Sequence, residues 1–198
     1  MGGMKITKDG FLSVDSYLVE DVLGNNQLVA MKDIIESPYF AWYFQQDTTY
    51  GYNNQYDETQ YGFRHCLFKD NEKMSAYSDM FLPLAHIVAD VVDKKLSYVK
   101  SMHVNLTLNH NKQHNGKPHI DHIETLKIDK PNSRYTAIFY LENVDGDTVF
   151  YKDDEETVVY KQSPIQNGLV IFESNHFHSA MLPCLFGKRR VVNINIWV

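Results

Sequence analysis

Cysteine is scarce in this sequence. There are two, Cys66 and Cys184, and neither lies in a CxxC or zinc-finger spacing. A disulfide framework is therefore not expected, and a reducing compartment fits.

Basic residues are fewer than acidic ones. The sequence has 19 Lys and Arg and 25 Asp and Glu, which gives a net charge of −6. A dedicated nucleic-acid-binding protein is normally basic, so nucleic acid is not an expected partner.

Long apolar runs are also missing. No stretch approaches the roughly 18 residues of a membrane span, and the N-terminal residues lack the apolar centre of a secretory signal. Apolar residues are nevertheless plentiful, since 43% of the chain is hydrophobic and 13% is aromatic, which is ample for a core. We therefore expect a soluble, cytoplasmic protein that does not bind membranes.

The first 96 residues mix helical patterns with aromatic-rich sequence. Apolar spacing and capping residues predict helices at about residues 15–23, 27–37 and 78–94, the second of which should end before Pro38. In the third, Pro83 should be tolerated only in the first turn. Segment 40–63 is too aromatic for a plain linker. We expect it to form a long functional loop or lid, or to pack beneath the helices.

From residue 97 onward the apolar period becomes two, which is typical of strands. Short strands are predicted at roughly ten-residue spacing, with turn signals such as "VDGD" and "DDEE" between them. This pattern predicts an antiparallel sandwich or barrel. We expect a mainly β fold supported by N-terminal α-helices, in one domain spanning 1–198. The predicted strands cover 98–108, 134–143, 148–152, 157–161, 167–174 and 189–198.

The stretch "KPHIDH" places His119 and Asp121 two residues apart, so that on a strand both side chains share one face. Two ligands cannot close a metal site, and "FESNHFHSAMLP" further along offers His176 and His178. Two histidines and one carboxylate form the facial triad of non-haem Fe(II) oxygenases, which leaves coordination positions open. The residues alone also allow these histidines to be ordinary loop residues.

Four segments of the second half carry a family resemblance through their residues and their order along the chain: "PHIDH", "YTAIFYLENVDGDTVFY", "NGLVIFESNHFHSAMLP" and "GKRRVVNINIW". Together they resemble the iron(II)- and 2-oxoglutarate-dependent dioxygenase superfamily, in particular its prolyl 4-hydroxylase-like branch. The resemblance covers about residues 97–198. It implies a double-stranded β-helix, or jelly roll, with 97–198 as the catalytic core and 1–96 as helical support and aromatic loop. Asp147 replaces one of two glycines in the family's hairpin, a departure that should affect the turn only.

The same resemblance implies Fe(II) as the metal, with His119, Asp121 and His178 as its ligands. His176 is the less favoured alternative to His178, because relatives place this ligand before a small residue and a nearby proline. The carboxylate of Asp121 also bears on the reaction. Related halogenases have a small residue at this position, so its presence favours hydroxylation or desaturation.

The cosubstrate 2-oxoglutarate needs a cation, because a buried carboxylate must be paired. The resemblance places this cation at the start of the last strand, in "GKRR". We favour Arg189, which shares its strand face with the polar Asn193, and Arg190 is the runner-up. Tyr140 matches a position where relatives direct a hydroxyl at the same carboxylate, although it is equally suited to a core. Asn105 is expected to line the cosubstrate pocket or to face solvent.

The expected activity is hydroxylation of a C–H bond in a peptide or amino-acid substrate, in the manner of a prolyl hydroxylase. O2 and 2-oxoglutarate would be consumed, and succinate and CO2 released. A small metabolite is a further candidate substrate. Two alternatives remain at this level, a cupin-like metal-binding protein of other chemistry and a catalytically idle binding module.

Overall fold

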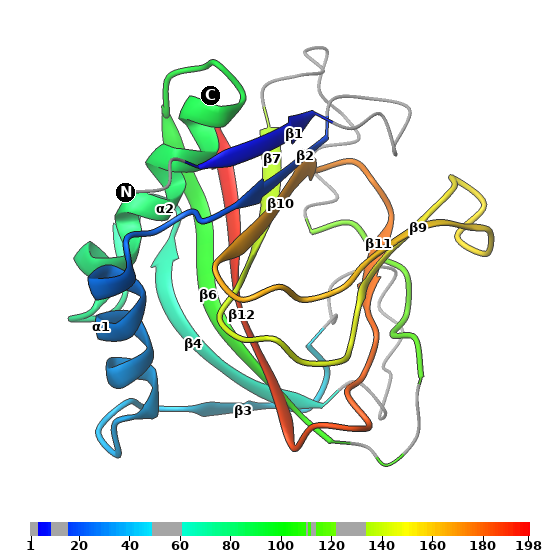
Figure 1. Cartoon of the computed structure of the whole chain (residues 1–198), viewed down its shortest axis with the longest axis horizontal. Helices are drawn as coiled ribbons and strands as arrows, with labels where there is room; N and C mark the ends of the chain where they lie inside the picture. Colours follow the sequence, from blue (N-terminus) through cyan, green and yellow to red (C-terminus); the bar gives the residue numbers. More distant parts are fainter. Residues whose placement is uncertain (1–3, 9–15, 49–60, 110, 112–113, 122–133) are drawn as a thin grey trace.

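A computed structural model describes residues 4–8, 16–48, 61–109, 111, 114–121 and 134–198. Within these ranges the chain forms two helices and twelve strands (Figure 1). The helices are α1 (Asn25–Glu36) and α2 (Ser78–Val91). The strands are β1 (Lys5–Lys8), β2 (Tyr17–Glu20), β3 (Tyr43–Gln45), β4 (Gly62–Lys69), β5 (Glu72–Lys73), β6 (Tyr98–Leu108), β7 (Arg134–Tyr140), β8 (Thr148–Tyr151), β9 (Val158–Gln162), β10 (Gly168–Glu173), β11 (His178–Ala180) and β12 (Lys188–Trp197).

The strands form two antiparallel sheets. The major sheet runs in the order β1-β2-β10-β7-β12-β6-β4-β3, with β5 paired to β4, and the minor sheet runs β11-β8-β9. The minor sheet lies on one side of the major sheet, and the helices lie on the other (Figure 1). The predicted mainly β jelly roll with supporting helices is confirmed, and the strands expected from residue 97 onward are present.

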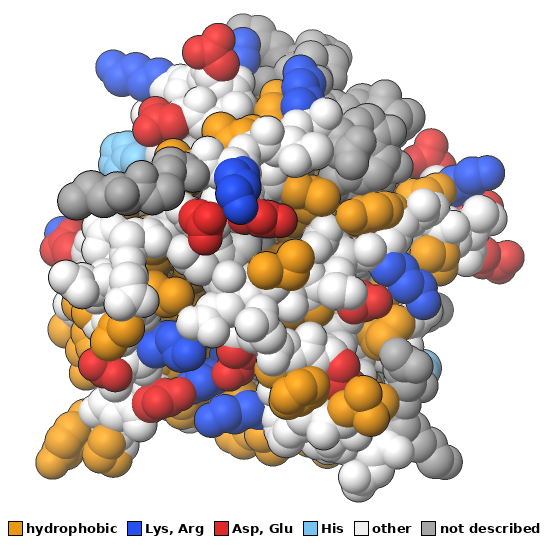
Figure 2. Space-filling view, in the orientation of Figure 1, with side chains coloured by type: hydrophobic (Ala, Val, Ile, Leu, Met, Phe, Trp, Pro, Cys, Tyr) orange, Lys and Arg blue, Asp and Glu red, His pale blue; other side chains and the backbone are white. Residues whose placement is uncertain are grey.

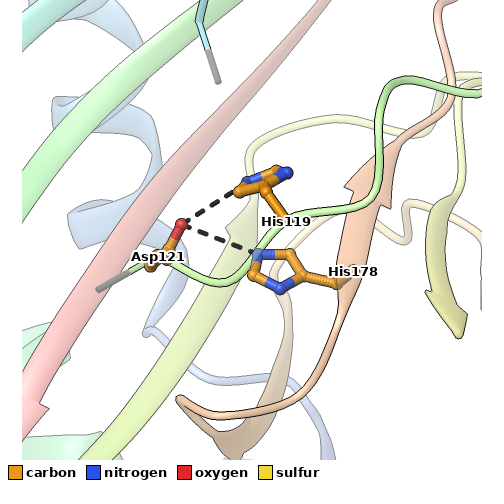
Figure 3. A group of neighbouring side chains, drawn as sticks. All are labelled: His119, Asp121 and His178. Carbon is orange, nitrogen blue, oxygen red and sulfur yellow. Dashed lines mark ion pairs between the residues drawn. The ribbon is translucent and has the colours of Figure 1, made fainter. Parts of the chain in front are cut away.

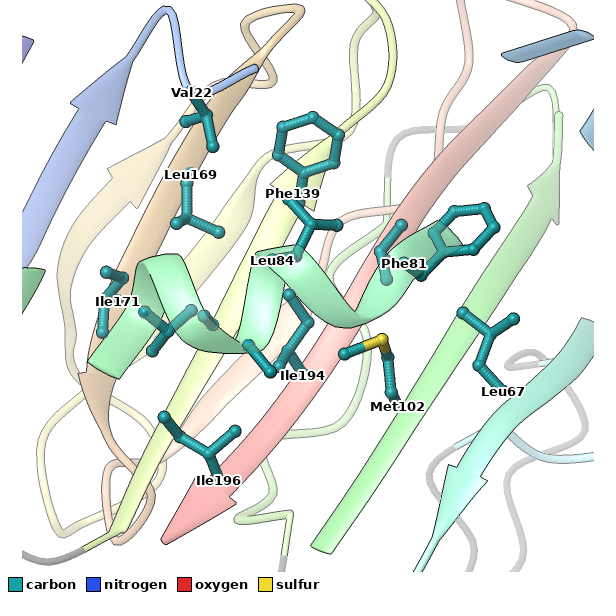
Figure 4. Packing of buried hydrophobic residues seen from close by; sticks show 14 of the residues in the cluster. Val22, Leu67, Phe81, Leu84, Met102, Phe139, Leu169, Ile171, Ile194 and Ile196 are labelled. Carbon is teal, nitrogen blue, oxygen red and sulfur yellow. The ribbon is translucent and has the colours of Figure 1, made fainter. Parts of the chain in front are cut away.

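Both faces of the major sheet are buried, which is why β7 and β10 are apolar along almost their whole length. One core lies between the sheet and the helices. There α2 lays Phe81 and Leu84 over Met102 and Ile194 (Figure 4). The second core lies between the two sheets and includes Phe150 of the minor sheet. The two cores thus pack the major sheet between the helices and the minor sheet.

The helix predicted at residues 15–23 is wrong. Tyr17–Glu20 is instead strand β2, which pairs with β10 through Val19 and Leu169. The side chains of Tyr17 and Val19 are buried on one face, so the segment has the period of a strand. The helices at 27–37 and 78–94 are confirmed, except that Pro83 lies in the second turn of α2 and not in its first.

The aromatic segment 40–63 contributes strands where a loop was expected. Its described residues include β3 and the start of β4, which pair with each other at the edge of the major sheet. Residues 49–60, the centre of the expected lid, lie outside the described residues.

In the face shown in Figure 2, Lys and Arg side chains are interspersed with Asp and Glu, and no basic stripe crosses that face. Neither described helix has the length and apolar content needed to cross a membrane.

Candidate metal centre

The structure brings His119, Asp121 and His178 together (Figure 3). One antiparallel bridge joins His119 to His178, with a backbone hydrogen bond of 2.9 Å in each direction. Asp121 Oδ1 lies 3.6 Å from Nε2 of His119 and 3.7 Å from Nε2 of His178. Candidate ligand atoms of all three residues lie within 4.8 Å of one another. The pairing of β11 with the segment before Asp121 therefore builds the cluster.

Backbone carbonyls fix the same tautomer in both imidazole rings. Nδ1 of His119 donates to the carbonyl of Lys117 (3.1 Å), and Nδ1 of His178 donates to the carbonyl of His176 (3.0 Å). The proton is thereby held on Nδ1, and the lone pair on Nε2 is directed toward Asp121. Burial and then the neighbouring His119 lower the pKa of His178 to about 4, so this ring is neutral at pH 7.

This donor set fits Fe(II). Nε2 of His178 is buried and makes no hydrogen bond to any described residue, which is costly unless a ligand such as a metal ion occupies the position. Two neutral imidazoles and one carboxylate suit Fe(II), and three protein ligands leave coordination positions open. His119, Asp121 and His178 would hold the ion.

A cavity of about 630 Å³, including its open mouth, adjoins the cluster. Arg189 of β12 forms part of its wall and is only 4% exposed. Its Nε donates to the carbonyl of Gly146 (2.6 Å) and its Nη2 to the hydroxyl of Thr148 (3.2 Å). No described carboxylate pairs with Arg189, so a buried cation faces the cavity without an ionic partner.

Thr148 was missed by sequence reasoning, although it lies at the centre of this wall. Its hydroxyl accepts hydrogen bonds from Arg189 and from the hydroxyl of Tyr140 (2.8 Å), so its own proton remains to be donated. Tyr140 itself does not line the cavity. It is buried between the sheets, where burial raises its pKa to about 12. Thr148 therefore faces the cavity, and Tyr140 contacts Thr148 from the core between the sheets through its hydroxyl hydrogen bond.

Arg190 and His176, the two alternatives from the sequence, lie elsewhere. Arg190 is on the opposite face of β12, where it forms ion pairs with Glu36 (2.7 Å) and Glu142 (3.0 Å). His176 does not line the cavity, and its backbone carbonyl orients His178.

Two polar residues of neighbouring strands, Asn105 and Arg64, also line the cavity. Asn105 of β6 lines the cavity, and its side-chain oxygen accepts a hydrogen bond from Nε of Arg64 in β4 (3.2 Å). Sequence reasoning proposed Asn105 but missed Arg64. β4 lies in the half of the chain where only helices and a loop were expected. The strand-favouring Phe63 and Phe68 of "GFRHCLFK" were the signal that could have identified this strand.

Gly146→Ala is expected to disturb the wall that holds Arg189. Gly146 has φ +96°, and an added Cβ would lie 2.7 Å from the carbonyl oxygen of Met181 and 2.9 Å from Cδ of Arg189. We expect the free energy of unfolding to fall by about 2–3 kcal/mol, measured by urea denaturation. Gly187→Ala is the control, because a Cβ there meets nothing within 4 Å. Equal stabilities of the two variants would contradict this account.

Comparisons with known proteins also point to an Fe(II) site in this fold. Residues 102–197 match the family model described as the 2OG-Fe(II) oxygenase superfamily. A search of curated proteins found no significant match. Among solved structures, the chain is similar to a 2OG-Fe(II) oxygenase family oxidoreductase from Burkholderia pseudomallei, with 10% identity, a TM-score of 0.65 and coverage of 91% of this chain and 84% of the other.

Two further structures are informative. A prolyl-4-hydroxylase from Pseudomonas putida has 12% identity and a TM-score of 0.60, with coverage of 92% of this chain and 91% of that one. The non-heme α-ketoglutarate-dependent epimerase SnoN of nogalamycin biosynthesis has 12% identity and a TM-score of 0.61, with coverage of 92% and 78%. At these identities the likeness shows a shared fold, and the epimerase shows that this fold carries more than one reaction.

The resemblance to the superfamily that was inferred from the sequence is confirmed by the family match, and the likeness to the prolyl-4-hydroxylase structure is a likeness of fold. The matched segment 102–197 contains His119, Asp121, His178 and Arg189. By this match, the segment 102–197 of the chain belongs to the 2OG-Fe(II) oxygenase superfamily.

Proposed function

We propose that the protein is an Fe(II)- and 2-oxoglutarate-dependent oxygenase that hydroxylates a C–H bond of a peptide or amino-acid substrate. The observation that carries the proposal is the convergence of His119, Asp121 and His178 at the edge of a cavity that also contains Arg189, a cation with no carboxylate partner among the described residues. A metal-binding group and a carboxylate-binding group in one cavity are what a chelating keto acid requires. A metal site alone would not need Arg189.

Each residue has a defined task in this proposal. His119, Asp121 and His178 hold the ion, and Fe(II) supplies the oxidation of the substrate by O2 while 2-oxoglutarate is converted to succinate and CO2. Arg189 and the hydroxyl of Thr148 bind the carboxylate of 2-oxoglutarate that lies away from the metal. A guanidinium that is fixed in place by Gly146 and Thr148 needs little reorganisation on binding.

The chain is proposed to act as one domain spanning 1–198, with 97–198 as the catalytic core. Strands β2 and β4 of the first half are built into the major sheet, and Arg64 of β4 lines the cavity. The described cavity therefore depends on both halves of the chain.

Anaerobic titration with Fe(II) and 2-oxoglutarate tests the proposal. We expect a weak visible charge-transfer absorption band only when both are present, because the band arises from the keto acid bound to the iron. His119→Ala should abolish the band. A protein that binds Fe(II) but develops no band with 2-oxoglutarate would be a metalloprotein of other chemistry, and one that binds neither would be an idle module. Either result contradicts the proposal.

The reaction is then tested in air with a panel of proline-containing peptides and free amino acids. Succinate release coupled to a product that has gained one oxygen atom supports hydroxylation, which the carboxylate of Asp121 favours. A product of unchanged mass but inverted configuration would indicate epimerisation, and loss of two hydrogens would indicate desaturation. Mass spectrometry and chiral chromatography separate these outcomes.

A further inference from the structure

Arg64 is a second arginine in the same cavity, and the proposed binding of Fe(II) and 2-oxoglutarate does not use it. Its Nε donates to Oδ1 of Asn105 (3.2 Å), and its Nη2 donates to the carbonyl of Thr48 (2.9 Å). Nη1 makes no hydrogen bond to a described residue. Arg189 is held in the same way, with Nε and Nη2 bound to the protein. Two fixed guanidinium groups thus each leave one amino group for a ligand.

The two arginines are held by different elements around the cavity. In the major sheet, β4 and β12 are separated by β6, so their backbones lie about 10 Å apart. Arg64 is tied toward Thr48, which follows β3, whereas Arg189 is tied toward Gly146 and Thr148, at the start of β8. The group that Arg64 binds is therefore distinct from the carboxylate that Arg189 binds.

Charge balance indicates what that group is. Among the described residues that line the cavity, the charged ones are Arg64, Arg189 and Asp121, since the histidines are needed as neutral ligands. With a divalent ion these sum to three positive charges, and dianionic 2-oxoglutarate neutralises two. One positive charge remains, and a buried charge is costly unless it is paired. Asp121 acts on Arg64 through its charge, but no described ion pair joins the two side chains.

We propose that Arg64 binds a carboxylate of the substrate, so that the enzyme selects a substrate bearing one negative charge close to the C–H bond that reacts. This inference rests on the proposed function. Arginine suits the role because its planar fork binds carboxylates in two-point geometry. The α-carboxylate of a free amino acid and the C-terminal carboxylate of a peptide share this chemistry, and the experiment below distinguishes them.

The test measures binding without turnover. Protein loaded with Mn(II) and 2-oxoglutarate is titrated calorimetrically with the free amino acids, with their C-terminal amides, and with short peptides ending in each amino acid or its amide. We expect at least one free acid or peptide acid to bind more tightly than its amide. The compound that binds best identifies the source of the carboxylate.

Arg64→Gln should weaken binding of that acid about 30-fold and leave binding of its amide unchanged, because only the acid pairs with the guanidinium. Arg134→Gln is the matched control. This arginine lies at the start of β7, over the ring of Trp197 at 4.4 Å, and does not line the cavity. The Arg134→Gln variant should bind the acid and the amide with the affinities of the wild type.

Fe(II) and 2-oxoglutarate binding is followed in parallel. We expect Arg64→Gln to keep the charge-transfer band of the wild type. If no acid is preferred over its amide, or if Arg64→Gln retains the preference, the role of Arg64 is refuted while the band leaves the proposed function intact. Loss of the band in Arg64→Gln would assign the residue to 2-oxoglutarate and also refute the proposal. A wild type without the band would refute the proposed function itself.

Discussion

His178→Ala is expected to abolish Fe(II) binding and, with it, all turnover of 2-oxoglutarate. The substitution removes one of three ligands, and even changes to residues that only support ligands cost about 10–100-fold in metal affinity. Fe(II) affinity should therefore fall by more than about 100-fold. In the metal-free protein the variant should also lose about 1–3 kcal/mol of unfolding free energy, because the buried ring packs on Phe172 and its Nδ1 donates to the carbonyl of His176.

His65→Ala is the matched control, since His65 is also buried but lies outside the metal centre. Its Nδ1 bonds to the carbonyl of Ala41 (2.7 Å), its Nε2 bonds to the hydroxyl of Ser75 (2.8 Å), and its ring stacks on Phe40. We expect a loss of about 2–3 kcal/mol in stability and unchanged Fe(II) affinity. Competition with a coloured chelator measures the affinity, and urea denaturation measures the stability. Retention of wild-type affinity in His178→Ala would remove the basis of the metal centre.

Arg189→Gln is expected to weaken the binding of 2-oxoglutarate about 100-fold and to leave Fe(II) affinity unchanged. The variant removes the cation from a buried charge pair, a change that costs roughly 2–5 kcal/mol. The charge-transfer band should be recovered at high concentrations of 2-oxoglutarate, because the iron ligands are intact. Titration of the band under anaerobic conditions gives the dissociation constant directly.

Arg190→Gln is the matched control for Arg189→Gln. It removes a positive charge from the same strand but from a residue that does not face the cavity. Arg190 points to the other face of β12 and is paired with Glu36 and Glu142. We expect it to lose about 1–3 kcal/mol of stability, since two partners of a buried cation are left behind, and to bind 2-oxoglutarate normally. If Arg190→Gln lost affinity for 2-oxoglutarate and Arg189→Gln did not, the two assignments would be exchanged.

The choice between these arginines illustrates how far strand periodicity reaches. The alternation of β12 put Arg189 on the face of Asn193, and in the structure both line the cavity. The alternation of β12 could not predict which residues of the minor sheet form the opposite wall of the cavity. Thr148 joins Arg189 only because the minor sheet faces the major one, and this contact depends on packing between strands that are distant in sequence.

The two halves of the chain were unequally predictable for a physical reason. The predicted strands after residue 97 are rich in β-forming residues and bounded by turn signals, and β6 also alternates, so local patterns define them. Strand β2 has four residues and β3 has three, and both are stabilised by neighbours contributed from elsewhere in the chain, such as β10 for β2. Local propensity is a weak guide where long-range pairing supplies most of the stabilisation.

The sequence by itself determined an antiparallel sandwich or barrel and the local pair His119 and Asp121, because period-two alternation and i, i+2 spacing are properties of a single extended segment, and the jelly roll followed from the family resemblance. Only the tertiary structure brought His178 to that pair, left Arg189 without an ionic partner in the part of the chain that is described, and added Arg64 to the cavity. Each of these depends on which strands lie side by side, and antiparallel pairing between remote segments is decided by burial of the whole sheet and not by any one stretch of residues.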